Sequence, residues 1–292
     1  MLRTFTLVIA LSTLFISHIV FAEDSIEVTP KYQRAFPIWA QEAIDLGYEL
    51  PKPYGFSINY MTMEQPLVVD SVAFTGLGDF IDDKISINGS EALQDSETLT
   101  FRADMWVLPF LNLYGVIGHT KGSSVANVQV DVDLPFFPEL DPFDFELNFK
   151  GTTYGVGGTI VGGIDNWFAL LDVNYTNTDL DILDGEISTI VVSPRVGYRT
   201  KVYGNDLQVW VGGMYQNVEQ TFSGYLKDIL PIGDSSIGDL IGDGKFEVNQ
   251  HLADKWNTLV GAQLHLGAGF DLLLEGGFGN RTSFMASIGY RF

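Results

Sequence analysis

The stretch SFMASIGYRF, residues 283–292, alternates apolar side chains with small or polar ones up to its last residue. This alternation has the two-residue period of a β-strand, in which successive side chains point to opposite faces. One face would be apolar throughout, with Phe284, Ala286, Ile288, Tyr290 and Phe292. A strand with an apolar outer face needs partners on both edges. We therefore predict that this strand belongs to a sheet that closes on itself.

The beginning of the chain has the features of a secretory signal. It has a basic residue at Arg3, an apolar run from 5 to 20, and small residues before a cleavage site after Ala22. The run is shorter than the roughly 20 residues of a spanning helix, so an uncleaved anchor is the weaker alternative. We predict a signal peptide over 1–22, a periplasmic N-terminal segment over 23–53 and a β domain over 54–292.

The charge balance excludes one class of partner. The chain has 16 Lys and Arg against 37 Asp and Glu, a formal net charge of −21. Because such a protein repels phosphates, we expect no nucleic-acid partner. The chain has no cysteine, so an exported domain would depend on backbone pairing and packing in place of disulfides.

The segment FPIWAQEAIDLGY, residues 36–48, predicts the one helix after the signal. Pro37 suits a first helical turn and Gly47 can end the helix. Trp39, Ala43 and Leu46 would share a face. We expect this short helix to be a tether at the periplasmic rim, and a small plug inside the sheet is the alternative.

From residue 54 onward the pattern predicts strands, many of them long enough to cross a membrane at a tilt. In ETLTFRADMWV, residues 97–107, Leu99 and Phe101 would face one side, and Arg102 and Asp104 the other. A soluble sandwich can show the same alternation. The predicted segments are 54–63, 66–75, 97–107, 111–121, 147–162, 166–178, 187–200, 206–220, 254–266, 269–279 and 283–292.

The connections between these segments alternate between short and long. Residues 108–110, 162–165 and 267–269 are tight, whereas 76–96, 122–146 and 221–253 are long polar insertions and 179–186 is intermediate. Only 280–282 is short where a long loop is expected. Short turns at one end and long loops at the other are typical of an outer-membrane barrel.

With Ile288, Tyr290 and Phe292 at its end, and with hairpin-like stretches at 106–122 and 256–292, the chain resembles bacterial outer-membrane β-barrel proteins, in particular uncharacterised proteobacterial barrels. The resemblance implies the outer membrane of a Gram-negative bacterium and contact with its lipids and lipopolysaccharide. It also implies that these three residues are an assembly signal for the barrel-assembly machinery during insertion. It implies no activity, because such barrels serve many functions.

An even strand number is expected for a single-chain barrel. Joining 54–75 into one long strand gives ten strands, and a further strand within 122–146 would give twelve. Either number predicts a narrow or filled bore. Charged residues on the inward face would either pair and plug the bore or line a water-filled path: Arg102, Asp104, Asp172, Arg195, Arg199, Asp271, Glu275 and Arg291.

The sequence offers little for catalysis, which needs a nucleophile and a positioned base, and we expect no enzyme. His119, near Ser123 and Ser124, is the one place where a lipid hydrolase could be sought. We expect no cofactor. A weak candidate for a divalent cation is a group of acidic residues, whose plainer interpretation is solvated surface charge: Asp179, Asp181, Asp184 and Glu186.

The leading functional hypothesis is therefore a narrow or gated channel for small solutes, favouring cations because acid dominates the loops. The alternative is a barrel with a plugged lumen that acts as an envelope-structural protein or binds a partner through its surface loops, and lipid hydrolysis is a remote third. An apolar group inside one acidic loop would form a lid or an adhesive surface: Leu134, Phe136, Phe137, Leu140, Phe143 and Phe145.

Overall fold

The computed structural model describes residues 31–76, 85–88, 91–132, 143–181, 184–225 and 244–292. The predicted signal peptide and residues 134, 136, 137 and 140 of the apolar loop group lie outside these residues. The chain divides into two compact units, Met1–Gln33 and Arg34–Phe292. The second unit contains every helix and strand described below.

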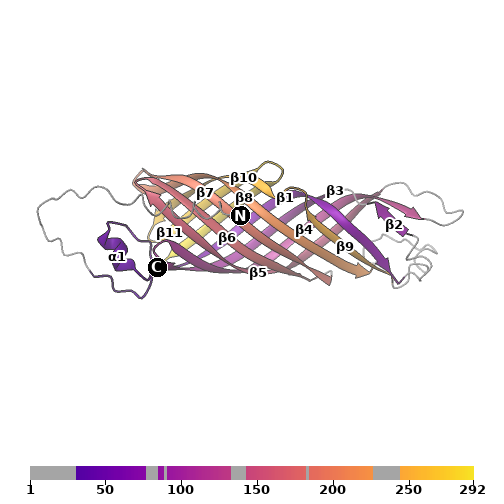
Figure 1. Cartoon of the computed structure of the whole chain (residues 1–292), viewed down its shortest axis with the longest axis horizontal. Coiled ribbons are helices and arrows are strands. Elements are labelled where there is room, and N and C mark those ends of the chain that lie inside the picture. Colours follow the sequence, from indigo (N-terminus) through magenta and orange to yellow (C-terminus); the bar gives the residue numbers. More distant parts are fainter. Residues whose placement is uncertain (1–30, 77–84, 89–90, 133–142, 182–183, 226–243) are drawn as a thin grey trace, which may run out of the picture. The chain divides into compact units, whose positions relative to one another are not determined.

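Ten antiparallel strands form a closed ring, and they run obliquely along its wall (Figure 1). The ring closes because β12 pairs with β1, from Gly55 opposite Arg291 to Glu64 opposite Thr282. The backbone N–H of Phe292 also donates to the carbonyl of Tyr54 at 2.9 Å. The closed sheet predicted from residues 283–292 is thus confirmed. The ring strands are β1 (Tyr54–Thr75), β3 (Glu91–Leu108), β4 (Leu111–Val132), β5 (Phe143–Ile164), β6 (Trp167–Leu180), β7 (Asp184–Val202), β8 (Asn205–Tyr225), β10 (Trp256–Gly267), β11 (Phe270–Phe278) and β12 (Thr282–Arg291).

The preferred count of ten strands holds because residues 54–75 form one uninterrupted strand. In the alternative region, residues 122–132 continue β4, and the short strand β2 (Ile85–Asn88) pairs with the end of β4. Within the described residues, 122–146 adds no further strand to the ring.

The outward side chains of the ten-stranded part form an apolar belt. Leu99, Ile117 and Val156 are 54%, 58% and 65% exposed, as expected for side chains that face hydrocarbon and not a protein core. Exposed aromatic rings flank the belt at both edges, where amphipathic rings favour the membrane interface. They are Phe110, Trp167, Tyr198, Phe270 and Phe292 at the short-turn end, and Tyr154, Tyr175, Trp256 and Phe278 at the other.

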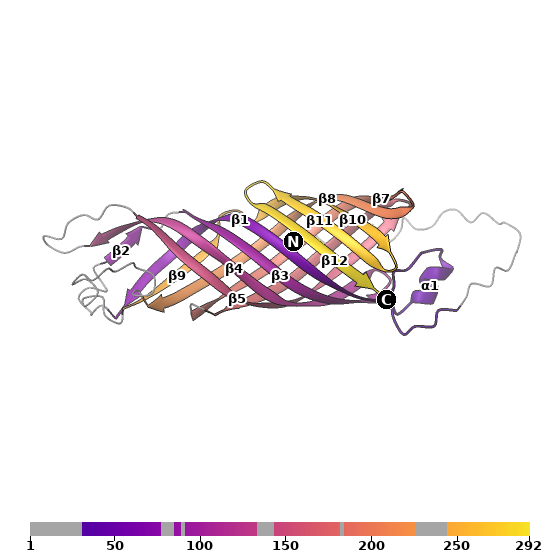
Figure 2. The ribbon, with the colours of Figure 1, turned by 180° about the vertical axis from the view of Figure 1, so that it is seen from behind.

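At the end remote from the short turns the ring narrows. Strand β9 (Lys245–Leu252) pairs with β8 on one side and with β1 on the other, whereas β10, β11 and β12 stop short of this level (Figure 2). Near Pro66, β1 exchanges β12 for β9 as its neighbour. The upper wall is therefore a smaller ring of eight strands, β1 and β3 to β9.

The narrowing corrects the expectation of long polar insertions. Residues 221–253 contain the end of β8 and all of β9, and the insertions at 76–96 and 122–146 contain extensions of β3, β4 and β5. Their outward side chains are largely polar, whereas their inward ones include the buried apolar Ala92, Ala126, Phe222 and Phe246 beside the buried polar Gln94, Ser124 and Gln250. The short turn at 280–282 also has its explanation here. Arg281 is 1% exposed and donates to the carbonyls of Asp254 and Lys255, so this turn ends beneath the chain that leaves β9.

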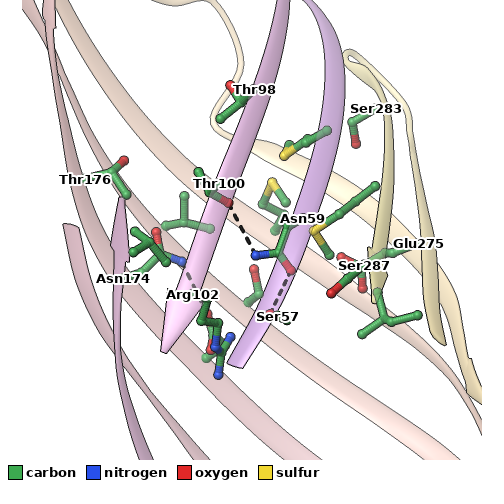
Figure 3. A pocket seen from close by; sticks show the side chains of 18 of the residues that line it. Ser57, Asn59, Thr98, Thr100, Arg102, Asn174, Thr176, Glu275, Ser283 and Ser287 are labelled. Atoms are coloured by element: carbon green, nitrogen blue, oxygen red, sulfur yellow. Dashed lines mark hydrogen bonds between the residues drawn. The ribbon is translucent and has the colours of Figure 1, made fainter. Parts of the chain in front are cut away.

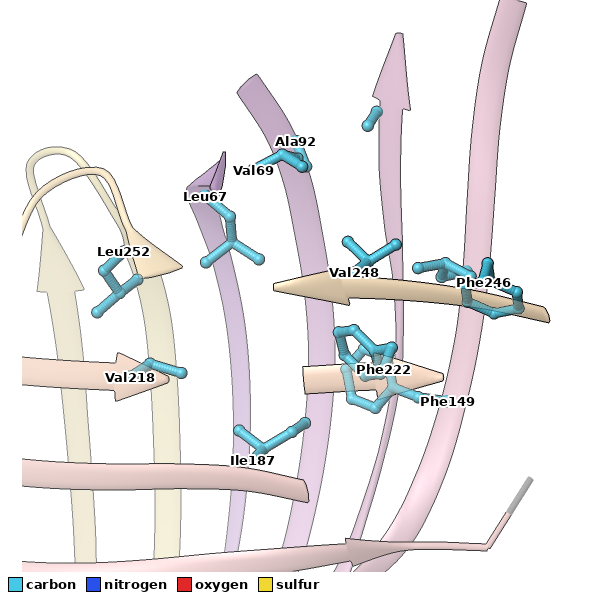
Figure 4. Packing of buried hydrophobic residues seen from close by; sticks show 12 residues of the cluster. Leu67, Val69, Ala92, Phe149, Ile187, Val218, Phe222, Phe246, Val248 and Leu252 are labelled. Atoms are coloured by element: carbon cyan, nitrogen blue, oxygen red, sulfur yellow. The ribbon is translucent and has the colours of Figure 1, made fainter. Parts of the chain in front are cut away.

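A buried apolar cluster fills the eight-stranded ring (Figure 4). Leu67 and Phe222 are fully buried, and the Phe149 and Phe222 rings lie 5.7 Å apart. Phe145, from the predicted apolar loop group, packs its ring edge-on against Phe246 at 6.2 Å and so points into this core. The outward face at the same level is polar and largely acidic, with exposed Glu64, Asp95, Glu97, Asp144, Glu146, Glu186, Glu219 and Glu247.

Helix α1 (Ala40–Asp45) is shorter than the predicted segment. The N–H of Ile38 donates to the carbonyl of Val107 at 2.8 Å, and the Trp39 ring lies 6.4 Å from that of Phe110. These contacts place the helix at the rim beside the β3–β4 turn, and none of its residues lines the bore. Within the described part of the chain, no helix is both long and apolar enough to cross a membrane.

Candidate functional site: a chamber beneath an apolar core

Below the apolar core, the ten-stranded part encloses a chamber of about 500 Å³. Figure 3 shows hydroxyl, amide and charged side chains pointing into it from several strands, with Asn59 donating to Thr100. Alternation along each strand sends every second residue inward, so the composition of the chamber changes with height. Among its lining residues we distinguish four groups, which we call the charged floor, the hydroxyl wall, the methionine wall and the glutamine layer.

The charged floor lies toward the short turns. Seven of the eight predicted lumen residues line the chamber here: Arg102, Asp104, Asp172, Arg195, Asp271, Glu275 and Arg291. The eighth, Arg199, does not, because Phe168 lines the chamber on that side. The Arg199 side chain is exposed, and its guanidinium carbon lies 5.2 Å from the centre of the Phe168 ring.

The most buried pair of the floor joins β7 to β11 across the bore. The Arg195 guanidinium donates to both oxygens of Glu275, at 2.7 and 2.8 Å, and the Trp210 indole N–H donates to Glu275 Oε2 at 2.7 Å. Both partners are largely shielded from solvent. The two parallel hydrogen bonds between the guanidinium group and the carboxylate give this ion pair a fixed geometry as well as charge neutrality.

A second set of contacts links β12, β3 and β4. Arg291 Nη2 lies 2.7 Å from Asp104 Oδ1, and the Asn112 amide donates to the same oxygen at 2.6 Å. The side-chain oxygen Oδ1 of Asn112 in turn accepts a hydrogen bond from Arg102 Nη2 at 3.0 Å. Arg102 stacks 3.6 Å above the Tyr114 ring, so its charge also meets an aromatic face.

Asp172 is held by uncharged donors. It accepts hydrogen bonds from the Tyr114 hydroxyl at 2.8 Å, Thr159 at 2.6 Å and Asn174 at 3.2 Å. At the β10–β11 hairpin, His265 Nδ1 lies 2.8 Å from Asp271 Oδ1. In the charged floor each carboxylate therefore has at least one hydrogen-bonding or charged partner.

Large rings fit into this narrow bore where the neighbouring strand carries glycine. A Cβ atom at Gly261 would lie 2.4 Å from the Trp210 ring, and one at Gly157 would lie 2.4 Å from the Tyr114 ring. These distances are far below van der Waals contact, so glycine at both positions is what allows Trp210 to reach Glu275 and Tyr114 to reach Asp172.

The middle of the chamber has two chemically different sides. The hydroxyl wall is a chain of contacts across β3 to β6, with Thr98 to Thr120 at 3.0 Å, Thr120 to Thr153 at 2.6 Å and Thr153 to Thr178 at 2.7 Å. The methionine wall comes from β1, β8 and β12 and consists of Met61, Met63, Met214 and Met285. Met61 and Met285 are direct cross-strand partners.

The glutamine layer closes the top of the chamber with Gln65, Gln94, Gln216 and Gln220. All four are at least 94% buried. Gln94 Oε1 accepts from the amides of Gln65 at 3.1 Å and Gln220 at 2.8 Å, which ties β1, β3 and β8 together. The Oε1 atoms of Gln65, Gln216 and Gln220 are buried without a hydrogen-bond partner.

Sequence reasoning missed this layer and the hydroxyl wall, because it searched for charges and assigned Gln94 and Gln220 to loops or strand ends. The alternation in EALQDS, residues 91–96, is the signal that could have placed Gln94 inside. Gln250, on β9 at a similar height, accepts from Ser124 at 3.4 Å and does not line the chamber.

Two of the four residues predicted for a cation site, Asp179 and Glu186, are direct cross-strand partners on β6 and β7. Asp179 accepts from the Tyr154 hydroxyl and Glu186 from the Asn177 amide, and Asp181 is exposed. The side chain of Asp184 lies outside the described ones. Among the residues described, no three His, Asp or Glu side chains are arranged to hold a metal.

The structure does not bring the residues of the predicted His119 site together. His119 is exposed on the outer face, whereas Ser124 is buried inside the barrel. Ser123 shares the outer face, but four residues along an extended strand separate its Cα from that of His119 by about 13 Å. His119 thus lies at the edge of the apolar belt without a nearby serine nucleophile.

The proposed assembly residues Ile288 and Tyr290 lie on the outer face of β12, and Phe292 directly follows this strand. Ile288 and Phe292 are about half exposed. The Tyr290 ring lies 4.8 Å from that of Phe270 and 5.6 Å from that of Phe56. The Phe292 ring lies 5.9 Å from that of Tyr54. These rings form a continuous aromatic seam where the first and last strands meet.

No protein-family model and no curated protein sequence matches the chain. Among solved structures it is similar to the β domain of the Bordetella autotransporter BrkA, with 13% identity, 82% of this chain and 100% of that one covered, and a TM-score of 0.40. It is also similar to the outer membrane protein OprG from Pseudomonas aeruginosa, with 12% identity, 83% of this chain and 97% of that one covered, and a TM-score of 0.36. A third similar structure is the toluene transporter TbuX from Ralstonia pickettii, with 11% identity, 83% of this chain and 90% of that one covered, and a TM-score of 0.32.

The location of the protein follows from its own geometry. In the ten-stranded ring each strand has a partner on both sides, so no sheet edge is exposed to hydrocarbon. Short turns at one end, an apolar belt and two aromatic girdles complete the pattern of bacterial outer-membrane barrels. The chain is therefore a transmembrane β-barrel of the Gram-negative outer membrane.

Proposed function

We propose that the protein is a gated channel for small solutes and that the apolar core of the eight-stranded ring is its gate. One observation supports this above others: the bore holds a chamber of about 500 Å³, with charged side chains at its floor and glutamines at its top, that ends under an apolar cluster. Side chains just fill the interior of a barrel of about eight strands, so the bore is sealed in the ring of eight and leaves room for a solute in the ring of ten. Apolar constrictions gate by excluding water from the path.

The acidic outer face above the belt disfavours anions at the entrance. Exposed Glu97, Asp144 and Glu219 belong to a surface on which acidic side chains outnumber basic ones. A surface of one sign raises the local concentration of counter-ions and lowers that of ions of like charge. Outer-membrane lipids and lipopolysaccharide are the partners that we propose around the belt.

The test is single-channel conductance of the refolded, signal-free protein in a planar bilayer. The double variant Phe222→Ala, Phe246→Ala removes two rings from the gate, and we expect it to conduct in longer and larger openings than the wild type. Phe284→Ala is the matched control, because this ring is 47% exposed on the lipid face and should not affect conductance. Heat-modifiable gel migration verifies that each protein is folded.

Silence of both the wild type and the folded gate variant would overturn the channel proposal. It would favour the second candidate, a plugged barrel whose function lies in its outer surface. The filled eight-stranded ring and its acidic outer face are the observations in favour of that candidate. It predicts that a cationic partner binds the wild type and the gate variant equally well.

A further inference from the structure

We infer that the chamber binds a small uncharged amphipathic molecule, with its hydrogen-bonding group at the glutamine layer and its apolar side against the methionine wall. This inference rests on the proposed function and deepens it, because it names the class of solute that would occupy the site below the gate. It follows from the distribution of charge, from unpartnered polar atoms and from the two unlike walls.

Charge is confined to the lower part of the chamber. The floor contains all seven charged lining residues, whereas the glutamine layer and the hydroxyl wall are uncharged. An ion that moved up to the glutamine layer would lose hydration beneath an apolar core without meeting an opposite charge, and this is unfavourable for either sign. An uncharged solute carries no such penalty.

The glutamine layer is a built polar site with unused capacity. The Gln65, Gln216 and Gln220 side chains each keep one buried oxygen without a partner, although buried polar groups are nearly always hydrogen-bonded. A ligand N–H or O–H would satisfy these oxygens. Because a carboxamide both donates and accepts, the layer suits an amide or hydroxyl group better than a hydrocarbon.

The methionine wall supplies an apolar surface next to the threonines, because Met61 is the direct cross-strand partner of Thr98. Met61, Met63, Met214 and Met285 come from three strands, and flexible, polarisable thioethers adapt to a bound apolar group and favour aromatic rings. The chamber volume of about 500 Å³ is within the usual range for small-molecule sites. A molecule with a ring on one side and an amide on the other would meet both walls.

The experiment compares three probes of nearly equal shape, namely benzamide, benzoate and benzamidinium. Isothermal titration of the refolded wild-type barrel in neutral detergent gives each affinity. We expect benzamide to bind at least about tenfold more tightly than either ion, which corresponds to roughly one buried hydrogen bond or more. Toluene tests whether the apolar side alone suffices, and it should bind more weakly than benzamide.

Two substitutions of the same type locate the site. Gln216→Met keeps the length of the side chain but removes one unpartnered oxygen of the layer, and should weaken benzamide binding about tenfold. Gln250→Met is the matched control, because Gln250 is also buried but does not line the chamber, and should leave the affinity unchanged. Gln65→Met replaces Gln216→Met if the latter fails to fold by gel migration.

Three outcomes would overturn the inference: no benzamide binding, equal binding of benzamide and either ion, or equal losses for Gln216→Met and Gln250→Met. These outcomes are distinct from failure of the channel. If benzamide binds the wild type but no gate variant conducts, the channel proposal is wrong and the binding site is supported. If the barrel conducts but does not bind benzamide, the binding site is wrong and the channel proposal is supported.

Discussion

Glu275 shows how a single side chain organises the floor, since its carboxylate joins Arg195 on β7 and Trp210 on β8. Glu275→Gln would leave the Arg195 charge buried without compensation, and we expect a loss of about 3–5 kcal/mol in the free energy of unfolding. Urea titration of the refolded barrel measures it. Glu97→Gln is the control, because its partner Lys121 is exposed on the outer face and such pairs contribute about 1 kcal/mol or less. Equal losses in both variants would contradict this assignment.

Gly261 tests the fit of the Trp210 ring. A valine at this position would occupy the space of the ring, so Gly261→Val should displace Trp210, break its hydrogen bond to Glu275 and lower both stability and the yield of folded barrel. Tryptophan emission and gel migration follow the two effects. Gly162→Val, at a strand position where an added Cβ meets nothing within 4 Å, should fold normally. An unchanged emission spectrum in Gly261→Val would refute the prediction.

At this scale the sequence revealed charges better than neutral groups. Alternation placed Asp172 and Arg195 inside because a charge on an otherwise apolar strand stands out. The same rule failed for Arg199, since period alone does not say where the chamber ends. The carboxamides and threonines remained unnoticed because their significance lies in neighbours such as Gln94 and Gln220, which are 126 residues apart in the chain.

Among the elements, β1 and β12 were predictable and β9 was not. The long first strand and the pairing of the last strand follow from the two-residue alternation of side chains and from the even number of strands that a closed barrel needs. Strand β9 has eight residues, KFEVNQHL, and its alternation is as regular as that of β12. Its polar outer residues, such as Glu247 and Asn249, made it look like loop, because above the membrane the outward face of a strand is polar.

We predict that β9 can be disrupted without unfolding the ten-stranded ring that lies in the membrane. Val248→Pro removes the backbone N–H of a residue that lies between Val72 on β1 and Phe222 on β8, so β9 loses a hydrogen bond to one of these two neighbours. We expect longer channel openings, with gel migration still showing a folded barrel. Val248→Ala retains the N–H and separates the backbone effect from the loss of the side chain. Loss of the folded band in Val248→Pro would mean that the membrane ring depends on β9.

Phe292, directly after β12, and Phe284 within it offer a matched pair of aromatic residues. Phe284 and Phe292 lie on the same outer face and are 47% and 46% exposed, so lipid contact alone predicts similar effects of substitution. If Phe292 is also the assembly signal, Phe292→Ala should lower the amount of protein in the outer membrane several-fold more than Phe284→Ala, while both refold alike in detergent. Equal membrane levels would remove the special function of the terminal ring.

For the whole molecule, the sequence predicted the barrel, its membrane and its ten-stranded part, because these depend on patterns repeated in every strand. It left open whether the bore is empty or filled. The structure shows both conditions at different heights, a chamber in the ring of ten and a core in the ring of eight. This division depends on which strands extend to each level. The pairing of strands that are far apart in the sequence, such as β1 and β9, cannot be predicted from the pattern of either segment alone.

The step from ten strands to eight also sets what it costs to open the barrel. The seal lies where the outer wall is acidic and wet, so amides that separate from β9 are immediately solvated, at a net cost of about 0.5–1.5 kcal/mol per hydrogen bond. The same separation between β11 and β12 would strand amides in hydrocarbon at several kcal/mol each. The eight-stranded ring can therefore open in water, while the ten-stranded ring in the membrane remains closed.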